Sequence, residues 1–220
     1  MDLMAPRNGL SGMPMSRSLP VVFVVDDDIS VRESLEALIL HEGWRPKVFD
    51  SAQEFLDYPP TTLPSCLVLD INLPDFNGLD IQHRLARDRR CLPVIFLTGY
   101  GDVPKTVRAM KAGAVEFFTK PVDNDALLGA IRNAIDISHA ALEREAEMNV
   151  LQERFASLSR REREVMALVS QGLLNKQVGG QLGISEITVK AHRGNVMEKM
   201  HAKSFAELVN MAGNLDLTTG

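Results

Sequence analysis

The feature that most constrains the fold of this 220-residue chain is a fivefold alternation of short apolar runs with amphipathic segments. Each run is short enough for a strand, and each is followed by residues with helical periodicity, so the pattern predicts repeated β/α units. The expected strands are Val21–Val25, Lys47–Phe49, Cys66–Leu69, Val94–Leu97 and Val115–Phe118. The expected helices are Val31–His41, Ala52–Asp57, Leu79–Arg87, Val103–Ala112 and a segment from Asp125 onward.

The strands are apolar throughout, whereas a strand with one exposed face shows alternating polar residues. A parallel sheet covered by helices on both faces explains this pattern, so we predict a doubly wound, five-stranded α/β domain over residues 21–136. Ser30 with Glu33 and Ser51 with Glu54 match the capping box that satisfies free amides at a helix start. Residues 1–20 mix Met, Pro, Ser, Gly and Arg without a period, and we expect a flexible leader there.

The segment after Asp125 has no strand signal and is rich in charge. We expect the last helix of the α/β domain to continue into a charged linker helix over residues 137–157. Its apolar residues form a partial stripe rather than sustained heptads, which favours a solvated spacer over a self-pairing helix.

The C-terminal residues predict a small all-α domain over 158–220. A capping box of Ser159 and Glu162 opens a helix that ends near Gly172, and a second helix covers Asn175–Leu182. Gly183 and Ile184 form a tight turn, after which Ser185 caps a helix to about Met200, and Ser204 with Glu207 opens a last one. Four short helices with this turn are typical of a helix-turn-helix domain.

Charge distribution bears on the partner of this domain. The formal net charge of −5 by itself disfavours nucleic acid, but the charge is not uniform. Between Ser159 and Lys203 the basic residues outnumber Glu162, Glu164, Glu186 and Glu198. These basic residues are Arg160, Arg161, Arg163, Lys176, Lys190, Arg193, Lys199 and Lys203.

Acidic residues follow two of the expected strands. Asp26, Asp27 and Asp28 come directly after the first strand, and Asp70 directly after the third. The carboxyl ends of central parallel strands border one crevice, so these carboxylates are expected to meet and to require a cation. Oxygen ligands without nearby His or Cys favour a hard ion, and Mg²⁺ is the usual one where phosphate is handled.

Two more strand ends supply a hydroxyl and an ammonium. Thr98 ends the fourth strand and Lys120 the fifth. A carboxylate can attack a phosphoryl group when a metal ion, a hydroxyl and an ammonium gather the transferred charge. Taken alone, the acids after the first strand are better explained as a helix cap, and Asp70 could be a turn former and Lys120 a surface charge. Together with Thr98 they predict phosphoryl capture.

These blocks resemble the signatures of two-component receiver domains, which have a flavodoxin-like fold. The resemblance covers Val21 to Arg132 and rests on Val25-Asp26-Asp27-Asp28, Leu69-Asp70-Ile71-Asn72-Leu73-Pro74, Leu97-Thr98-Gly99 and Thr119-Lys120-Pro121. It implies that Asp70 accepts the phosphoryl group and that Mg²⁺ is held by Asp27 directly, by Asp26 through water, by Asp70 and by the backbone carbonyl of Asn72. Thr98, Lys120 and Phe117 are implied as the phosphate-binding and switch residues, with a cis Lys120–Pro121 peptide. On residues alone, Phe117 beside Phe118 is nearly as well explained as core.

The C-terminal residues, from Leu158 to about Gly213, resemble LuxR-type helix-turn-helix domains, and the whole chain resembles the FixJ subfamily. The resemblance rests on Leu158 to Val165, Gly172 to Val178 and Leu182 to Arg193. It implies that Lys190, Ala191 and Gly194 face the bases, although Gly194 has no side chain with which to read them. Gly179 and Gly180 also depart from the pattern, because each glycine inside a helix costs roughly 1 kcal/mol relative to Ala.

The expected DNA contacts are of three kinds. Ser185 and Thr188 offer hydroxyls and free amides to a phosphate at a helix N-terminus, and Lys176, Lys199 and Lys203 meet phosphates without reading sequence. Lys190 and Ala191 read base edges, and Arg193 lies on the same helix. A solvated helix face is the competing interpretation for Lys190 and Arg193.

The sequence thus predicts a transcription regulator that a sensor histidine kinase phosphorylates at Asp70, so that it dimerises and binds double-stranded DNA. The resemblance also implies RNA polymerase as a partner. A phosphorylation-independent DNA-binding protein with a receiver used only for assembly is the main alternative. An aspartate-based phosphatase is disfavoured because Asn72 is neutral, so we expect no enzyme beyond self-phosphorylation and self-dephosphorylation. A quorum regulator would lack the acidic pocket.

Composition and cysteine content limit where the chain acts. Cys66 and Cys91 each adjoin an apolar run and are expected to be reduced core residues. No apolar stretch approaches the ~20 residues needed to span a bilayer, and the start lacks a signal-peptide h-region. We therefore expect a cytoplasmic protein with no membrane partner.

Overall fold

The computed structural model describes residues 19–74, 78, 81–82, 84–85, 92–99 and 103–217, with side chains from 107 onward in the last range. These residues divide into two compact units, with the boundary between Leu142 and Glu143. Each unit is described by itself. Within the described residues, no helix is both long enough and apolar enough to cross a membrane.

The first unit contains a five-stranded parallel sheet in the order β2-β1-β3-β4-β5, which confirms the doubly wound prediction. The strands are β1 (Val21–Val25), β2 (Arg45–Phe49), β3 (Ser65–Asp70), β4 (Val94–Thr98) and β5 (Glu116–Thr119). The helices are α1 (Ile29–His41), α2 (Ala52–Asp57), α4 (Val103–Lys111) and the long α5 (Asn124–Ala156). Of the expected helix Leu79–Arg87, positions 81, 82, 84 and 85 are described, and they are helical.

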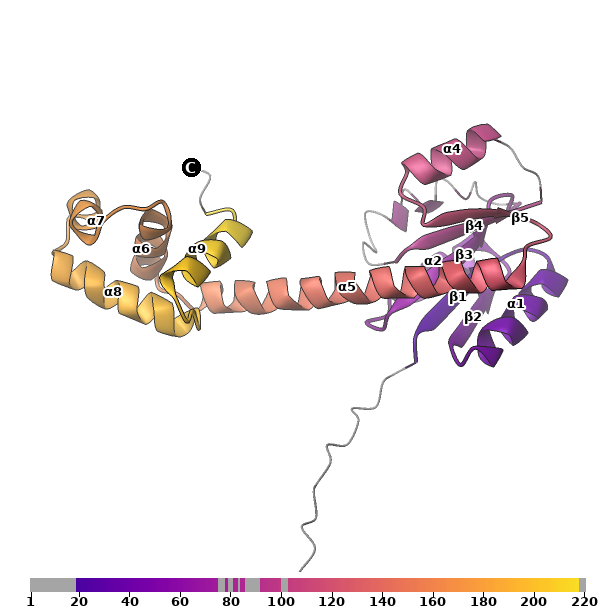
Figure 1. The fold of residues 1–220 in the computed structure, drawn as a ribbon, viewed down its shortest axis with the longest axis horizontal. Coiled ribbons are helices and arrows are strands. Elements are labelled where there is room, and N and C mark those ends of the chain that lie inside the picture. The colour runs from indigo at the N-terminus through magenta and orange to yellow at the C-terminus, as the bar shows by residue number, and fades with distance from the viewer. Residues whose placement is uncertain are drawn as a thin grey trace, which may run out of the picture. The chain divides into compact units, whose positions relative to one another are not determined.

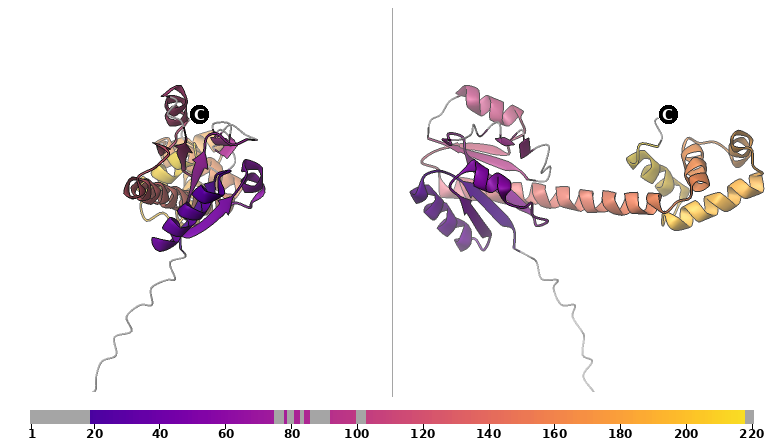
Figure 2. Two further views of the ribbon diagram at one scale, coloured as in Figure 1. Left: turned by 90° about the vertical axis from the view of Figure 1, so that its right-hand side faces the viewer. Right: turned by 180° about the vertical axis from the view of Figure 1, so that it is seen from behind.

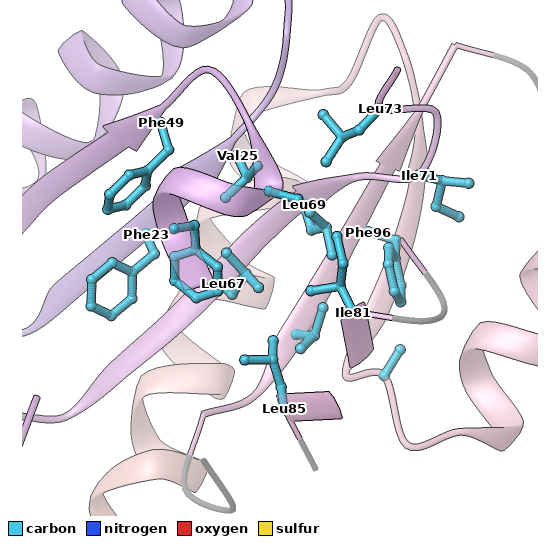
Figure 3. Packing of buried hydrophobic residues seen from close by; sticks show 14 of the residues in the cluster. Phe23, Val25, Phe49, Leu67, Leu69, Ile71, Leu73, Ile81, Leu85 and Phe96 are labelled. Carbon is cyan, nitrogen blue, oxygen red and sulfur yellow. The ribbon is translucent and has the colours of Figure 1, made fainter. Parts of the chain in front are cut away.

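Two apolar clusters hold the two faces of the sheet. Alternate strand residues such as Phe23, Leu67 and Phe96 pack with α2 and α4 (Figure 3). Their neighbours, including Val24 and Ile95, pack with α1 and the first part of α5, which lies in front of the sheet in Figure 1 and behind it in the reverse view of Figure 2. Because β1, β3 and β4 are covered on both faces, every residue in them is buried.

The outer strands β2 and β5 are more polar than the central ones. Pro46 lies in β2, an edge strand that pairs only with β1 among the described residues of this sheet. Proline has no backbone N–H to donate, and an edge strand tolerates the missing hydrogen bond. Cys66 is buried, and its pKa is raised to about 12 because burial disfavours the thiolate. Cys91, the other expected core cysteine, lies outside the described residues.

The helix starts show which local signals determined structure. Ser51, Ser159, Ser185 and Ser204 each cap a helix as predicted, and Ser159 with Glu162 forms the full capping box. The Ser30–Glu33 prediction is wrong: α1 begins at Ile29, and the Asp28 carboxylate accepts from the Ser30 amide at 2.8 Å. A carboxylate is the stronger cap because its charge also interacts favourably with the helix dipole.

The second unit is all-α. It contains the end of α5, then α6 (Arg160–Ser170), α7 (Asn175–Leu182), α8 (Glu186–Lys199) and α9 (Phe205–Asn214). Its core includes Leu151 from α5, Val165 and Met166 from α6, and Val196 from α8. The short α7–α8 connection turns at Gly183, whose φ of 67° is left-handed. This is the predicted helix-turn-helix arrangement.

Candidate functional site

An acidic pocket lies at the carboxyl ends of β1 and β3, where the strand order reverses. Asp26 follows β1 and Asp70 ends β3, and both side chains are buried. Asp27 is exposed beside them, and one carboxylate oxygen from each of the three acids lies within 4.8 Å of the others. Open α/β sheets bind ligands at this kind of switch point.

Lys120 joins two of these acids. It lies directly after β5, and its Nζ donates to Asp26 Oδ2 and Asp70 Oδ2, each at 2.6 Å. Burial raises the pKa of Asp26, although the Lys120 ammonium opposes that shift. Burial would lower the pKa of Lys120, but hydrogen bonds and charge interactions with Asp26 and Asp70 raise it, so the ammonium stays charged. The peptide between Lys120 and Pro121 is cis, as the resemblance implied.

Asn72 and Thr98 adjoin these acids. The Asn72 backbone N–H donates to Asp70 Oδ1 at 2.8 Å. Its side-chain amide donates to the hydroxyl of Thr98 at 3.2 Å, and Thr98 is buried at the end of β4. Phe117 is half-buried on β5, is paired in register with Phe96 of β4, and packs on the cluster shown in Figure 3.

The pocket residues fit a hard divalent cation. The two buried carboxylates and the exposed Asp27 carboxylate repel one another, and the Lys120 ammonium offsets that repulsion for Asp26 and Asp70. An all-oxygen donor set of this kind suits Mg²⁺ or Ca²⁺ rather than zinc or copper. Asp28 is not part of the set, since it caps α1 and hydrogen bonds from Ser30 lower its pKa.

The second unit presents an exposed helix face. On α8, Val189 and Val196 point into the core, whereas Lys190, Ala191 and Gly194 are exposed. At its start the Ser185 hydroxyl accepts from the Thr188 amide at 3.1 Å, and the two hydroxyls lie 2.8 Å apart. Lys176 and Lys203 are also exposed.

Two of the predicted DNA-contacting side chains are engaged inside the unit. Arg193 donates to Asn175 Oδ1 at 3.3 Å, and its guanidinium lies 4.2 Å from the centroid of the Phe205 ring. Lys199 donates to the buried Glu162 at 2.7 Å. This hydrogen bond is the largest cause that lowers the pKa of Glu162 to about 2.

Comparison with known proteins assigns a family to most of each unit. Residues 22–132 match the response regulator receiver domain family, and residues 156–212 match the luxR family of bacterial regulatory proteins. The chain is 45% identical over 210 residues to nodulation protein W of Bradyrhizobium diazoefficiens, covering 96% of this chain and 92% of that protein. It is 41% identical to the transcriptional regulatory protein FixJ of Rhizobium meliloti, covering 87% and 94%.

The chain belongs to the two-component transcriptional response regulators. Among solved structures it is similar to response regulator StyR, with a TM-score of 0.78, 42% identity, and coverage of 89% of this chain and 99% of that one. Full-length FixJ from B. japonicum gives a TM-score of 0.54 and 39% identity, with coverage of 90% and 97%.

Two residues of this response regulator, Arg32 and Ile187, were not singled out by the sequence pattern, and Asn72 was singled out only for its backbone carbonyl. Arg32 reaches back from α1 to the loop that carries the acids, and its spacing of one helical turn beyond Asp28 was the available signal. Asn72 takes part through its side chain as well as its backbone. Ile187 is 82% exposed on α8, four residues before Ala191 and therefore on the same helix face.

Proposed function

We propose that this response regulator is switched by phosphorylation of Asp70, with a sensor histidine kinase as the donor. One observation carries the proposal: the Nζ of Lys120, after β5, lies 2.6 Å from a carboxylate oxygen of Asp26, after β1, and of Asp70, at the end of β3. A carboxylate beside an ammonium at a switch point suits phosphoryl capture, because the ammonium can neutralise charge on the transferred group.

The metal is proposed to be Mg²⁺, held by Asp26, Asp27, Asp70 and the backbone carbonyl of Asn72. When bound, it would neutralise the phosphoryl oxygens and so permit approach of an anionic nucleophile. The three carboxylates fit this assignment because they are close together and supply only oxygen ligands.

In the proposed transfer, a carboxylate oxygen of Asp70 forms the new O–P bond while the donor's N–P bond breaks, and its electron pair remains on the imidazole nitrogen. Lys120 then pairs with the phosphoryl oxygens instead of bridging the two acids. Thr98, already at the end of β4, donates its hydroxyl to another phosphoryl oxygen, and Phe117 follows it inward. The product is an acyl phosphate, and no separate catalytic activity is proposed.

The output is proposed to be binding to double-stranded DNA through the exposed face of α8. Lys190 and Ala191 would read base edges, and Lys176, Lys203 and the start of α8 at Ser185 and Thr188 would meet phosphates. An ammonium has three N–H donors and Glu162 takes one of those of Lys199, so Lys199 can also meet a phosphate. To contact DNA, Arg193 would have to leave its contacts with Asn175 and Phe205 or keep them while it also binds DNA.

Phosphorylation is proposed to promote a homodimer that recruits RNA polymerase. The domain limits proposed are 21–136 for the receiver, 137–157 for the linker part of α5 and 158–220 for the DNA-binding domain. Residues 1–18, most of the expected leader, lie outside the described residues.

The test combines phosphorylation with DNA footprinting. The full chain and Asp70→Asn are treated with phosphoramidate and Mg²⁺, and acyl phosphate is measured by intact mass. Wild type should gain one phosphoryl group and protect discrete sites on chromosomal fragments more strongly, and Asp70→Asn should do neither. Equal footprints with and without phosphodonor would instead favour a receiver used only for assembly.

A further inference from the structure

The side chain of Arg32, in α1, holds the loop between β1 and α1. Arg32 Nη1 donates to the backbone carbonyl of Asp26 at 2.7 Å and to that of Asp27 at 2.9 Å. The Asp26 side chain adds a third restraint, because its Oδ1 accepts from the Asp28 backbone N–H at 3.1 Å. Asp28 itself is fixed as the cap of α1.

The two carbonyls that Arg32 holds belong to the peptide planes on either side of Asp27. The torsions φ and ψ of a residue are defined by the orientations of these two planes, so the guanidinium fixes both torsions of Asp27. They in turn set the direction of its Cα–Cβ bond. Asp27 needs this restraint more than the other acids because its side chain is exposed, whereas those of Asp26 and Asp70 are buried.

We propose that Arg32 is a positioning residue that pre-orients Asp27 as a cation ligand in the acidic pocket. The inference rests on the proposed function, since it assumes that the acids hold Mg²⁺. Partners that orient metal ligands typically contribute 10–100-fold to metal affinity, because a ligand that is already in place loses less conformational freedom on binding.

Charge and positioning make opposite predictions for Arg32. A guanidinium is always protonated, so as a charge it repels a nearby cation, and its removal would tighten Mg²⁺ binding. As a positioning group it supports the ligand, and its removal weakens binding. Arg32→Gln removes both the charge and the Nη1 donor, whereas Arg32→Lys keeps the charge but loses the longer, planar guanidinium that carries Nη1.

The experiment is a Mg²⁺ titration of the unphosphorylated full chain, followed by the backbone amide NMR shifts of Asp26, Asp27 and Asp28. Both Arg32 variants should bind Mg²⁺ roughly tenfold more weakly than wild type. The Asp27 amide shift should also differ before Mg²⁺ is added. Arg132→Gln is the matched control, because Arg132 pairs with the Glu42 side chain, and it should bind like wild type.

Unchanged or tighter binding by Arg32→Gln, with wild-type binding by Arg32→Lys, would overturn the inference and leave the metal site intact. A wild-type chain that shows no saturable Mg²⁺ shifts at these amides would overturn the metal assignment itself, and this inference with it. If Arg32→Gln does not fold, as judged by Trp44 fluorescence, the result for Arg32→Lys decides.

Discussion

Gly179 and Gly180 are neighbours in α7, yet the structure assigns them opposite roles. A Cβ added to Gly179 would lie 2.7 Å from the backbone carbonyl oxygen of Ile184, whereas one added to Gly180 would meet nothing within 4 Å. The same turn is closed by hydrogen bonds from the Gly183 and Ile184 amides to the Gly179 carbonyl. Gly179 therefore allows α7 to pack directly on the turn that precedes α8, and it is not a soft point in the helix.

Replacement of each glycine by alanine separates helix propensity from packing. Both variants gain the same propensity, which for Gly→Ala in a helix interior is about 1 kcal/mol. Gly180→Ala should therefore be more stable than wild type by about 0.5–1 kcal/mol. Gly179→Ala must also displace a backbone carbonyl, and overpacking of this kind typically costs about 1–3 kcal/mol. We expect the second unit of Gly179→Ala to be less stable than that of Gly180→Ala by about 1–3 kcal/mol.

Native-state hydrogen exchange on the full chain measures this difference within the second unit. Buried amides such as Val196 report its opening, and Trp44, the chain's one tryptophan, reports the receiver by fluorescence during urea unfolding. Receiver stability should be the same in both variants. Equal protection of the second unit in Gly179→Ala and Gly180→Ala would show that the α7–α8 contact is not tight and would refute the reasoning.

Two further predictions concern the second unit. The pKa of Glu162 in the folded state is about 2, below its ordinary value of 4.5. The ionised carboxylate therefore stabilises the fold fully above pH 4.5, and this contribution is lost as the pH falls from 4.5 toward 2. Glu162→Gln should therefore flatten the acid-side loss of stability measured by hydrogen exchange or circular dichroism, and the exposed control Glu198→Gln should not. Lys190→Ala should relax base preference in a binding-site selection, whereas Lys176→Ala should weaken all sequences alike and reduce the salt slope by about 1. Equal effects of both lysine changes on every sequence would contradict the assignment of α8 as the base-reading helix.

Local sequence signals predicted most of the architecture. Strand burial and helix periodicity predicted the β/α order, since a strand covered on both faces can be apolar throughout. Serine caps predicted four helix starts, because a serine hydroxyl accepts from a backbone amide two or three residues ahead, and this contact does not depend on the tertiary structure. The same reasoning failed at Ser30, where Asp28 stands two residues earlier and provides a charged cap.

Long-range contacts were beyond those signals. The pairing of Lys199 with Glu162 joins residues 37 positions apart, and in the sequence Lys199 looks like any surface lysine of a basic helix. The contact between Arg193 and Phe205 was also not predictable from local signals, since it depends on where α9 begins relative to α8. Gly179 looked like a propensity defect because its close neighbour, the Ile184 carbonyl, is brought near only by the turn.

The order of residues along this chain determined which groups end the strands, because a parallel sheet brings all carboxyl ends to one edge and the acids, hydroxyl and lysine occupy those positions. Only the tertiary structure decided which of them touch: that Lys120 bridges Asp26 and Asp70, that Asn72 holds Thr98 through its side chain, and that Arg32 fixes the backbone around Asp27. Hydrogen bonds depend on separations of a few tenths of an ångström. Such separations are set by the packing of the whole sheet and its helices, and no local pattern encodes them.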